Sequence, residues 1–430
     1  MPHIINMIKP NGSSFMRIFL TILFSVLLLC KGHAQNNNSP YSLLGIGDLE
    51  DGFANRTSGL SSTGIAYRNS RNLITNNPAS LSALENQWFA GEIGIKGKFV
   101  SYSGNPVSTT NSTSTDITFK RFTLGTKLFK HWGSAIGIAP YSSENYEYTG
   151  TKPLGVGGNL IPSYNEGYGG INKVFWANGY EFFNHLSIGI TSSYLFGAIS
   201  TKNVIQGPSG SAIYLSKNDK TFYNNFYFDY GIQYYTALNK HWDISLGLVY
   251  ANEGWLNTDH QITILDIDSI AIRSKRDVGT FTIPASYGAG LTITRNKKYT
   301  FLADYRFQDW GSLRSNTNDF LYEKSQRASV GFEISNQTTA YNTRFETSFI
   351  QAGLYYNKSY IIVNGKPIED MGVTAGFGIN AKRTPLNLNV SLQYGIRGTT
   401  ENNLIKENYF GATFIFSYRD FWFTKGRKFE

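Results

Sequence analysis

Residues Leu386 to Tyr394 read LNLNVSLQY, and apolar and polar side chains alternate at every position of this stretch. Successive side chains of a β-strand point to opposite faces, so one face of this segment is wholly apolar and the other wholly polar. The same alternation recurs down the chain, behind a single hydrophobic N-terminal run. A soluble sandwich also alternates. Strand length, aromatic strand ends and an export signal together predict an outer-membrane β-barrel instead.

The composition fits one large closed sheet, although a chain of 430 residues could also hold two domains. Aromatic residues make up 15% of the chain, charged residues make up only 16%, and 43 residues are glycine. Tyr and Phe are strand formers, and Gly suits turns, bulges and close packing inside a barrel. The composition therefore favours an all-β fold.

Residues 16–34, MRIFLTILFSVLLLCKGHA, form the one long apolar run of the sequence. A positive start, an apolar core and small residues before the cleavage site are typical of a signal peptide. The apolar core is too short to span a bilayer, which needs ~20 residues. We predict a signal peptide over residues 1–34 that is cleaved between Ala34 and Gln35, with Met16 as an alternative start.

Alternation and turn signals predict fourteen strands, an even number, as a single-chain bacterial barrel requires. Connections after even-numbered strands are tight, as at residues 130–131 and 184–185, except that the one after the tenth strand is somewhat longer. Those after odd-numbered strands are long and polar. Short periplasmic turns and long outer loops are typical of such barrels. The seventh and eighth strands are predicted at residues 242–252 and 279–294, joined by a long loop.

Residues 35–86, between the signal and the first strand, are too polar and Gly-rich for a domain with its own core. We expect them to fold into the lumen as a plug, and the alternative is a disordered periplasmic tail. Asn77 is a candidate N-cap, and Pro78 the first residue, of a short helix. Residues 87–424 then form the barrel and residues 425–430 a periplasmic tail.

Strand parity places ionisable and tyrosine side chains in the lumen, because Arg or Lys facing lipid near the midplane would cost ~2–4 kcal/mol. Their expected role is to pair with one another or to anchor the plug, and the alternative is contact with a solute. On the eighth strand, the same parity turns Phe281 and Ile283 toward lipid. The lumen-facing candidates are Glu92, Lys96, Tyr223, Tyr227, Asp229, Asp304, Arg306 and Glu333.

Two prolines, Pro140 and Pro284, fall inside predicted strands. Each removes a donor from the hydrogen-bond ladder and locally opens the wall. They are candidates for a lateral gap through which an apolar molecule passes from the lumen into the bilayer. The alternative is that each lies near the outer rim, where pairing ends in any case.

The sequence contains no motif that predicts catalysis. Cys30 is the only cysteine and lies inside the signal, and the histidines beyond the signal lack a short metal-ligand spacing. No nucleophile elbow, P-loop or dinucleotide fingerprint stands between a predicted strand and a helix. We expect a protein that is not an enzyme, without metal, cofactor or nucleic-acid partner.

Two tripeptides before the first strand, Gly64-Ile65-Ala66 and Asn77-Pro78-Ala79, resemble the N-terminal hatch of the FadL-type family. This family comprises outer-membrane transporters for long-chain fatty acids and other hydrophobic compounds. The resemblance implies a fourteen-stranded barrel, a number that strand counting reaches separately. It also implies that Gly64, Ala66, Asn77, Pro78 and Ala79 belong to the motif that plugs the lumen.

The opening residues 39–48 and the ending in Trp422-Phe423 look like the branch of this family found in Bacteroidota. Residues 69–72, NSRN, depart from the acidic and small residues that are usual in the family at this place. Some relatives in that lineage serve as accessory barrels of the type IX secretion system. Membership of the family therefore does not by itself imply transport.

Together these features predict an outer-membrane channel for passive uptake of hydrophobic small molecules such as long-chain fatty acids. In the expected mechanism, outer loops capture the ligand, a shift of the plug around residues 77–79 releases it, and it leaves laterally near a strand defect. The alternative is a non-transporting scaffold that serves protein secretion or surface assembly. Expected partners are outer-membrane lipid and lipopolysaccharide, a hydrophobic ligand and, under the alternative, a secretion-system protein.

Overall fold

The computed structural model describes residues 39–50, 52–104, 107, 112–153, 160–206, 214–266, 270–314, 320–340, 343–380 and 385–421. The predicted signal peptide with Cys30, its cleavage site, the C-terminal tail and Trp422-Phe423 lie outside the described residues. Among the residues described, no helix is long and apolar enough to cross a membrane.

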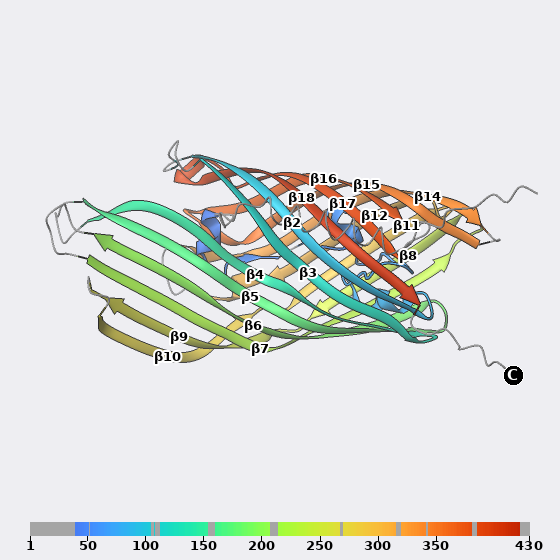
Figure 1. Ribbon diagram of the computed structural model, residues 1–430, viewed down its shortest axis with the longest axis horizontal. Helices are drawn as coiled ribbons and strands as arrows, with labels where there is room; N and C mark the ends of the chain where they lie inside the picture. The colour runs from blue at the N-terminus through green and yellow to red at the C-terminus, as the bar shows by residue number, and fades with distance from the viewer. Residues whose placement is uncertain are drawn as a thin grey trace, which may run out of the picture.

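The wall is one antiparallel sheet that closes on itself, because its last strand pairs with its first (Figure 1). Within the described ranges, fourteen spans form this wall, and two of them are interrupted, so that each comprises two strands. The spans are β2 (Trp88–Gly104), β3 (Thr113–Phe129), β4 (Trp132–Pro153), β5 (Leu160–Phe182), β6 (Leu186–Gln206), β7 (Tyr214–Ala237), β8 (Trp242–Ala251) with β9 (Gly254–Leu265), β10 (Ala271–Ile283) with β11 (Ser286–Arg295), β12 (Tyr299–Asp309), β14 (Lys324–Ala340), β15 (Thr343–Val363), β16 (Lys366–Asn380), β17 (Leu386–Arg397) and β18 (Ile405–Phe421). The predicted fourteen-stranded all-β barrel is therefore confirmed.

Several short elements accompany the wall. Two strands, β1 (Asp48–Leu49) and β13 (Leu321–Tyr322), are two-residue bridges to β4 and β15. The 3-10 helices are η1 (Pro40–Leu43), η2 (Arg56–Leu60), η3 (Pro78–Ala83), η5 (Trp310–Ser312) and η6 (Glu401–Asn403).

Residues 386–394, whose alternation predicts the barrel, form a strand with a buried polar face and an exposed apolar face. In β17, Asn389 is only 4% exposed and faces the interior, whereas Tyr394 is 50% exposed on the outer surface. A soluble sandwich would bury the apolar face and expose the polar one. Because β17 does the opposite, its apolar face is placed to meet lipid.

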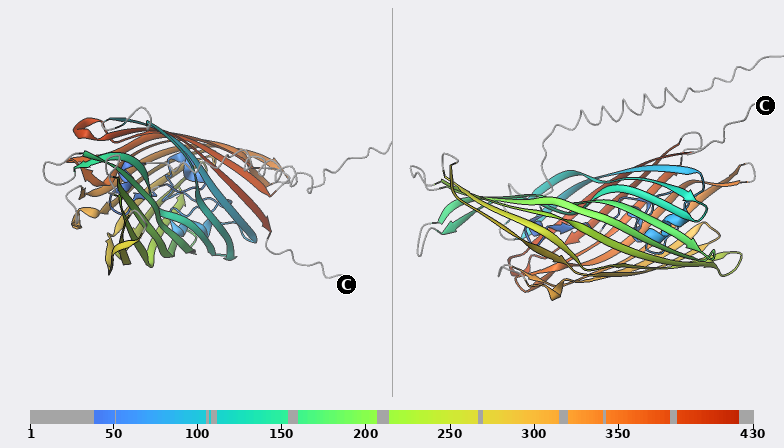
Figure 2. Two further views of the ribbon diagram at one scale, coloured as in Figure 1. Left: turned by 60° about the vertical axis from the view of Figure 1, so that its left-hand side comes forward. Right: turned by 90° about the horizontal axis from the view of Figure 1, so that it is seen from below.

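The barrel is taller on one side than on the other. Strands β4 to β7, together with the hairpin of β9 and β10, reach farther toward one end than β2, β3 and β16 to β18 do (Figures 1 and 2). The tight turns, such as the one between β3 and β4, lie at the opposite end. The taller side therefore projects at the outer end of the barrel.

The prediction of a long loop between the seventh and eighth strands is wrong, because this region forms the hairpin of β9 and β10. β9 continues β8 after a break at Asn252 and Glu253, and it pairs with β10 along its whole length. At Pro284 and Ala285 the ladder is interrupted again, so the alternation changes phase between β10 and β11. Phe281 and Ile283 consequently pack inside rather than toward lipid, and Ile283 is fully buried in an apolar cluster.

Residues 39–50 and 52–86, referred to below as the N-terminal segment, lie within the barrel (Figure 1). The segment is rich in Ser, Asn and Gly and forms only three short 3-10 helices and β1. Asn77 caps η3 as predicted, since its side chain accepts a hydrogen bond from the backbone N–H of Ala79. With so little regular structure, the segment depends on the wall for its hydrogen bonds and packing.

Glycines of the wall allow η3 and its N-cap to lie directly against the strands. A methyl group on Gly133 would overlap the carbonyl oxygen of Leu81, and one on Gly231 would overlap the Asn77 side chain. At Gly179 a Cβ would lie 2.5 Å from the oxygen of Pro78. At Gly133 and Gly179 backbone meets backbone, and at Gly231 backbone meets the Asn77 side chain, so the positions tolerate no side chain.

We predict that Gly189→Ala loosens η3, because its Cβ would overlap the backbone nitrogen of Ala79. Overpacking of this kind costs about 1–3 kcal/mol, which should lower the temperature at which heat-modifiable gel migration is lost. Gly97→Ala is the matched control, since the nearest atom to its Cβ would be the Asp116 oxygen at 3.9 Å. Equal midpoints for the two variants would contradict the close contact.

Candidate functional site

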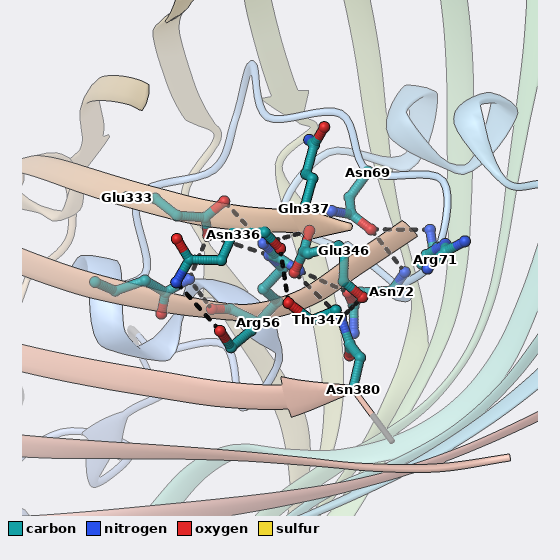
Figure 3. Close-up of polar contacts among 12 residues, drawn as sticks. Arg56, Asn69, Arg71, Asn72, Glu333, Asn336, Gln337, Glu346, Thr347 and Asn380 are labelled. Carbon is teal, nitrogen blue, oxygen red and sulfur yellow. Dashed lines mark hydrogen bonds and ion pairs between the residues drawn. The ribbon is translucent and has the colours of Figure 1, made fainter. Parts of the chain in front are cut away.

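Arg56, on η2, holds the N-terminal segment to the wall (Figure 3). Its guanidinium is buried and contacts Glu333 of β14 with Nη2 at 2.8 Å and Glu346 of β15 with Nη1 at 2.7 Å. Nη1 also donates to Asn72 at 3.3 Å, and the group lies 3.8 Å above the ring of Phe349. One cation from the segment thus satisfies two carboxylates of the wall.

The buried charges form a network rather than a single pair. Burial disfavours the charge of Arg56, but Glu333 and Glu346 outweigh it and hold the Arg56 pKa well above its ordinary value. Tyr67 donates to Glu333 at 3.0 Å and Gln351 donates to Glu333 at 2.6 Å. Breaking one partner of such a pair is costly because the remaining charges stay buried.

The predicted plug motif lies in a second set of contacts. Asp304 of β12 accepts hydrogen bonds from the backbone N–H of Gly64 at 2.6 Å and of Ile65 at 2.9 Å. The Asn77 amide donates to the carbonyl oxygen of Ile65 at 2.9 Å. Ala66 and Ala79 are fully buried, and the Asn77 amide also reaches the carbonyls of two wall residues, Ile232 and Leu248.

Charged lumen candidates other than Asp304 and Glu333 also lie in the interior. Glu92 forms an ion pair with Arg121 and accepts a hydrogen bond from the backbone N–H of Leu73 at 3.0 Å. The Arg306 guanidinium donates to the carbonyl oxygen of Asn76 at 3.1 Å, and the Lys96 ammonium donates to Gln393 at 2.7 Å. Asp229 lines an interior cavity, Tyr227 belongs to a buried apolar cluster, and Tyr223 packs against that cluster.

The wall has a gap between β3 and β4. The two strands pair from Phe129 and Trp132 up to Phe122 and Ile138, and there the ladder ends. Above that point, among the described residues, β3 pairs only with β2, while β4 continues along β5 with a register shift at Pro140. In hydrocarbon, an unpaired strand edge is costly, so this edge needs another partner.

The N-terminal segment supplies that partner. Its first residues, 39–50, are here named the latch segment, and β1 within it pairs with Ser142 and Ser143 of β4. The backbone N–H of Glu50 donates to the carbonyl oxygen of Tyr141 at 3.0 Å. The Glu50 carboxylate lies 2.6 Å from the ammonium of Lys120 on β3, so the latch segment bridges both sides of the gap.

The latch segment is held on its other side by β17 and β18. The Asp48 carboxylate accepts two hydrogen bonds from Arg397, at 2.7 and 2.6 Å, and Ser39 donates to Glu407 at 2.7 Å. Burial favours the neutral form of Asp48, but the charge of Arg397 outweighs it and holds the Asp48 pKa below its ordinary value. Asp48 is therefore ionised at neutral pH.

Two interior cavities lie beside the gap. A cavity of about 210 Å³ is lined by apolar groups that include Phe53 and Pro140. Its charged lining consists of two carboxylates, Glu50 and Asp229, and five cations, Lys120, Arg121, Lys173, Arg306 and Arg327. A second cavity, of about 460 Å³, shares Lys120 and Arg327 with it and extends toward Arg397. Pro284, the other predicted gap residue, lies at the break between β10 and β11, where its carbonyl accepts from Gln308 at 2.7 Å.

Sequence reasoning did not find Arg56 and Arg121, which pair with lumen candidates. It also missed Glu346, the second partner of Arg56, and the latch contacts of Asp48 and Glu50. One signal was available: a segment expected to enter the lumen carries several charges, which need partners there. The described residues contain no group of three His, Cys, Asp or Glu side chains that could hold a metal ion.

The closed wall, its lipid-facing apolar side and its polar interior define an outer-membrane β-barrel. A family model described as BamG matches residues 15–430, and the chain belongs to the BamG family. No curated protein sequence matches the chain.

Solved structures with a similar fold have low sequence identity. The P. putida toluene transporter TodX has a TM-score of 0.58 at 15% identity, covering 88% of this chain and all of that one (100%). The Ralstonia pickettii toluene transporter TbuX has a TM-score of 0.55 at 14% identity, with 86% and 98% covered. A Pseudomonas aeruginosa FadL homologue has a TM-score of 0.58 at 11% identity, with 88% and 100% covered. At such identities the likeness establishes the fold.

We predict that Arg56→Met lowers the free energy of unfolding by about 3–5 kcal/mol, because Glu333 and Glu346 would remain buried without their cation. The urea midpoint for loss of heat-modifiable migration measures this change. A triple variant that adds Glu333→Gln and Glu346→Gln removes the unpaired charges and should recover most of the loss. Wild-type stability of Arg56→Met alone would refute the role of the network.

The lowered pKa of Asp48 gives a pH prediction. A carboxyl whose pKa falls on folding contributes stability above its unfolded pKa, about 3.9, and loses it as the pH falls through the folded pKa. Asp48→Asn should therefore increase hydrogen exchange of residues 39–50 by a constant factor from pH 5 to pH 8, after correction for intrinsic rates. In strong acid the two proteins should converge. A difference that grows from pH 5 to pH 8 would contradict this assignment.

Proposed function

We propose that this barrel admits small molecules with an apolar body, long-chain fatty acids among them, and releases them through the gap between β3 and β4. The observation that carries the proposal is the end of the β3–β4 ladder at Phe122 and Ile138, beside a cavity that reaches Pro140. Two similar structures are described as toluene transporters, which supports an apolar ligand class.

The depth of the gap suits an exit into the bilayer. Pro140 is eight residues above Trp132, roughly 25 Å along the strand and less along the membrane normal, because barrel strands are tilted by about 35–45°. Ile117 and Phe119 of β3 are exposed beside the gap and would contact lipid tails there. A ligand leaving at this height would enter the outer half of the hydrocarbon layer.

The lining of the smaller cavity favours a ligand with an anionic head. Phe53, Ala139 and Pro140 offer apolar contact. The five cations of the lining outnumber its two carboxylates, of which Glu50 pairs with Lys120, so positive charge is in excess. A long-chain fatty acid combines an apolar tail with a carboxylate, so both parts would find matching groups. A neutral aromatic molecule would use the apolar part alone.

In our mechanism the latch segment, and not the region around Asn77, moves to open the gap. Asn77 donates to three carbonyl oxygens and fits against Gly231 without free space, so a shift there would break many contacts at once. The contact of β1 with β4 is only two residues long. Its release would open β4 to lipid while η2 and η3 stay in position.

Two disulfide locks test this route. Leu49→Cys with Ser142→Cys would tie β1 to its partner on β4, whereas Ser82→Cys with Ser187→Cys would tie η3 to β6, where the two hydroxyls lie 2.7 Å apart. We predict that the first lock blocks uptake of a radiolabelled long-chain fatty acid by cells, that reductant restores it, and that the second lock has little effect. The chain carries no cysteine beyond Cys30 to interfere.

Uptake that equals that of a strain lacking the protein, with or without reductant, would refute transport of this ligand. Uptake that is normal with the first lock closed would refute the gap as the route. Formation of each disulfide is checked by gel mobility of the purified protein before uptake is compared. The second lock thus controls for fixing the N-terminal segment at another place.

A second candidate function is a non-transporting scaffold that serves protein secretion or surface assembly, with a secretion-system protein as its partner in a bacterium of the Bacteroidota. The observation that favours it is the firm seating of the N-terminal segment by Arg56 and by wall glycines. Gentle detergent extraction followed by mass spectrometry separates the two functions. Copurified fatty acid supports the channel, and a stoichiometric protein partner supports the scaffold.

A further inference from the structure

The hairpin of β9 and β10 stands outside the bilayer. β8 and β11 have ten residues each, and 9–11 tilted residues suffice to cross the hydrocarbon layer. Trp255, at the start of β9, is 58% exposed and suits the membrane interface. Beyond it, the same face of β9 carries Asn257, Asp259 and Gln261, which are polar. The hairpin therefore extends into water at the outer end of the barrel.

Within the part of the chain that the structure describes, one edge of this hairpin pairs with no strand. β10 pairs with β9 through twelve residues, and the ladders of the described residues give it no second neighbour. Its upper part is exposed, and Val278 is 72% exposed. By contrast, the open edge of β4 is partly covered by the latch segment. Along β10 a row of backbone N–H and C=O groups faces outward over roughly 30 Å.

The base of this edge is fixed in position. Phe281 lies edge-on to Tyr223, with ring centroids 6.3 Å apart, and it also packs 6.4 Å from Trp310. Ile283 and Trp310 are fully buried in the same apolar cluster. A strand anchored in this way presents its edge in one orientation, which lowers the entropic cost of pairing with another strand.

We propose that an extended segment of a different polypeptide docks on the outer edge of β10 and adds a strand to the sheet. A free strand edge is best satisfied by another backbone, because only a strand offers donors and acceptors at the matching spacing. The proposal concerns a surface remote from the gap, so it does not depend on transport.

The charges of the edge indicate the chemistry of the partner. Arg276 is engaged by Asp259 across the hairpin, at 2.8 and 2.6 Å, and Lys275 lies 3.7 Å from Asp277. Arg273 has no ion-pair or hydrogen-bond partner among the described side chains. Acidic residues opposite Arg273 and Lys275 would complete the pairing. Charged edges also discourage indiscriminate association, which makes a matching partner more selective.

Pairing of β10 with β10 of a second copy is excluded by symmetry. Two copies in one membrane have the same orientation, with their outer ends on the same side of the bilayer. A twofold axis between them must therefore lie along the membrane normal. Strands tilted by about 35–45° from that axis would cross each other by about 70–90° after a half-turn. Two strands at that angle cannot form a ladder, so β10 of a second copy is not the docking segment, and we assign that segment to another protein.

Site-specific photo-crosslinking in intact cells tests the proposal. Benzoylphenylalanine replaces Ser274, Arg276 or Val278 on the edge in turn, and Gln261 on β9 serves as the control position. We expect adducts with a single protein from the edge positions and at least about tenfold less from Gln261. From each probe position to the next, which is two residues along β10, mass spectrometry should show that the crosslinked residue on the partner also shifts by about two positions.

Four outcomes would each overturn the proposal. The adducts could scatter over many proteins, fail to shift along the partner, join two copies of this chain, or not form. Lys275→Pro and Arg276→Pro provide a backbone test, because adjacent residues direct their N–H groups to opposite sides of β10. One variant should disturb the hairpin. The other should keep the normal heat-modifiable migration and still lose the adduct by about tenfold. Full adduct yield from both would also overturn it.

Discussion

Inside hydrocarbon every backbone N–H and C=O needs a partner within the protein, and this requirement shapes the whole molecule. It explains why the last strand returns to pair with the first, and why the apolar alternation faces outward. It also makes the end of the β3–β4 ladder informative. Where β3 leaves β4, the latch segment pairs with the exposed edge through β1. The N-terminal segment is therefore part of the hydrogen bonding of the wall as well as its filling.

A segment with so little regular structure stays in place because the wall is built around it. Glycines allow its backbone to touch the strands directly, and two carboxylates of the wall, Glu333 and Glu346, pair with its Arg56. Each device alone would be weak, because buried charges gain little over apolar packing and glycine contributes no side chain. Together they make one arrangement far better than any other. Asn72, within the stretch that departs from the FadL pattern, is itself a partner of Arg56.

Most of the wall could be predicted from sequence, since period-two alternation and tight turns are local signals. Pro284 was visible too, but its effect on the phase of the strand was not, and Phe281 and Ile283 were assigned to the wrong face for that reason. The β9–β10 hairpin was missed because the Asp-rich connection between its strands indicates a loop. Glu333 was placed in the lumen by parity, whereas its partner Arg56 lies 277 residues away in an irregular segment. No local sequence pattern predicts a pair that is so far apart in the chain.

The gap and the tall outer sheet have one geometric cause. β4 follows β3 only as far as Ile138 and then continues with β5, and the strands up to β10 rise with it beyond the rim (Figure 1). A sheet that leaves a cylinder must have two edges. One is the β4 edge at the gap, which the latch segment partly covers from within, and the other is the outer edge of β10, which stands in water. Because lipid penalises an open edge and water does not, only the first required a partner from the same chain, and the second was left available to another.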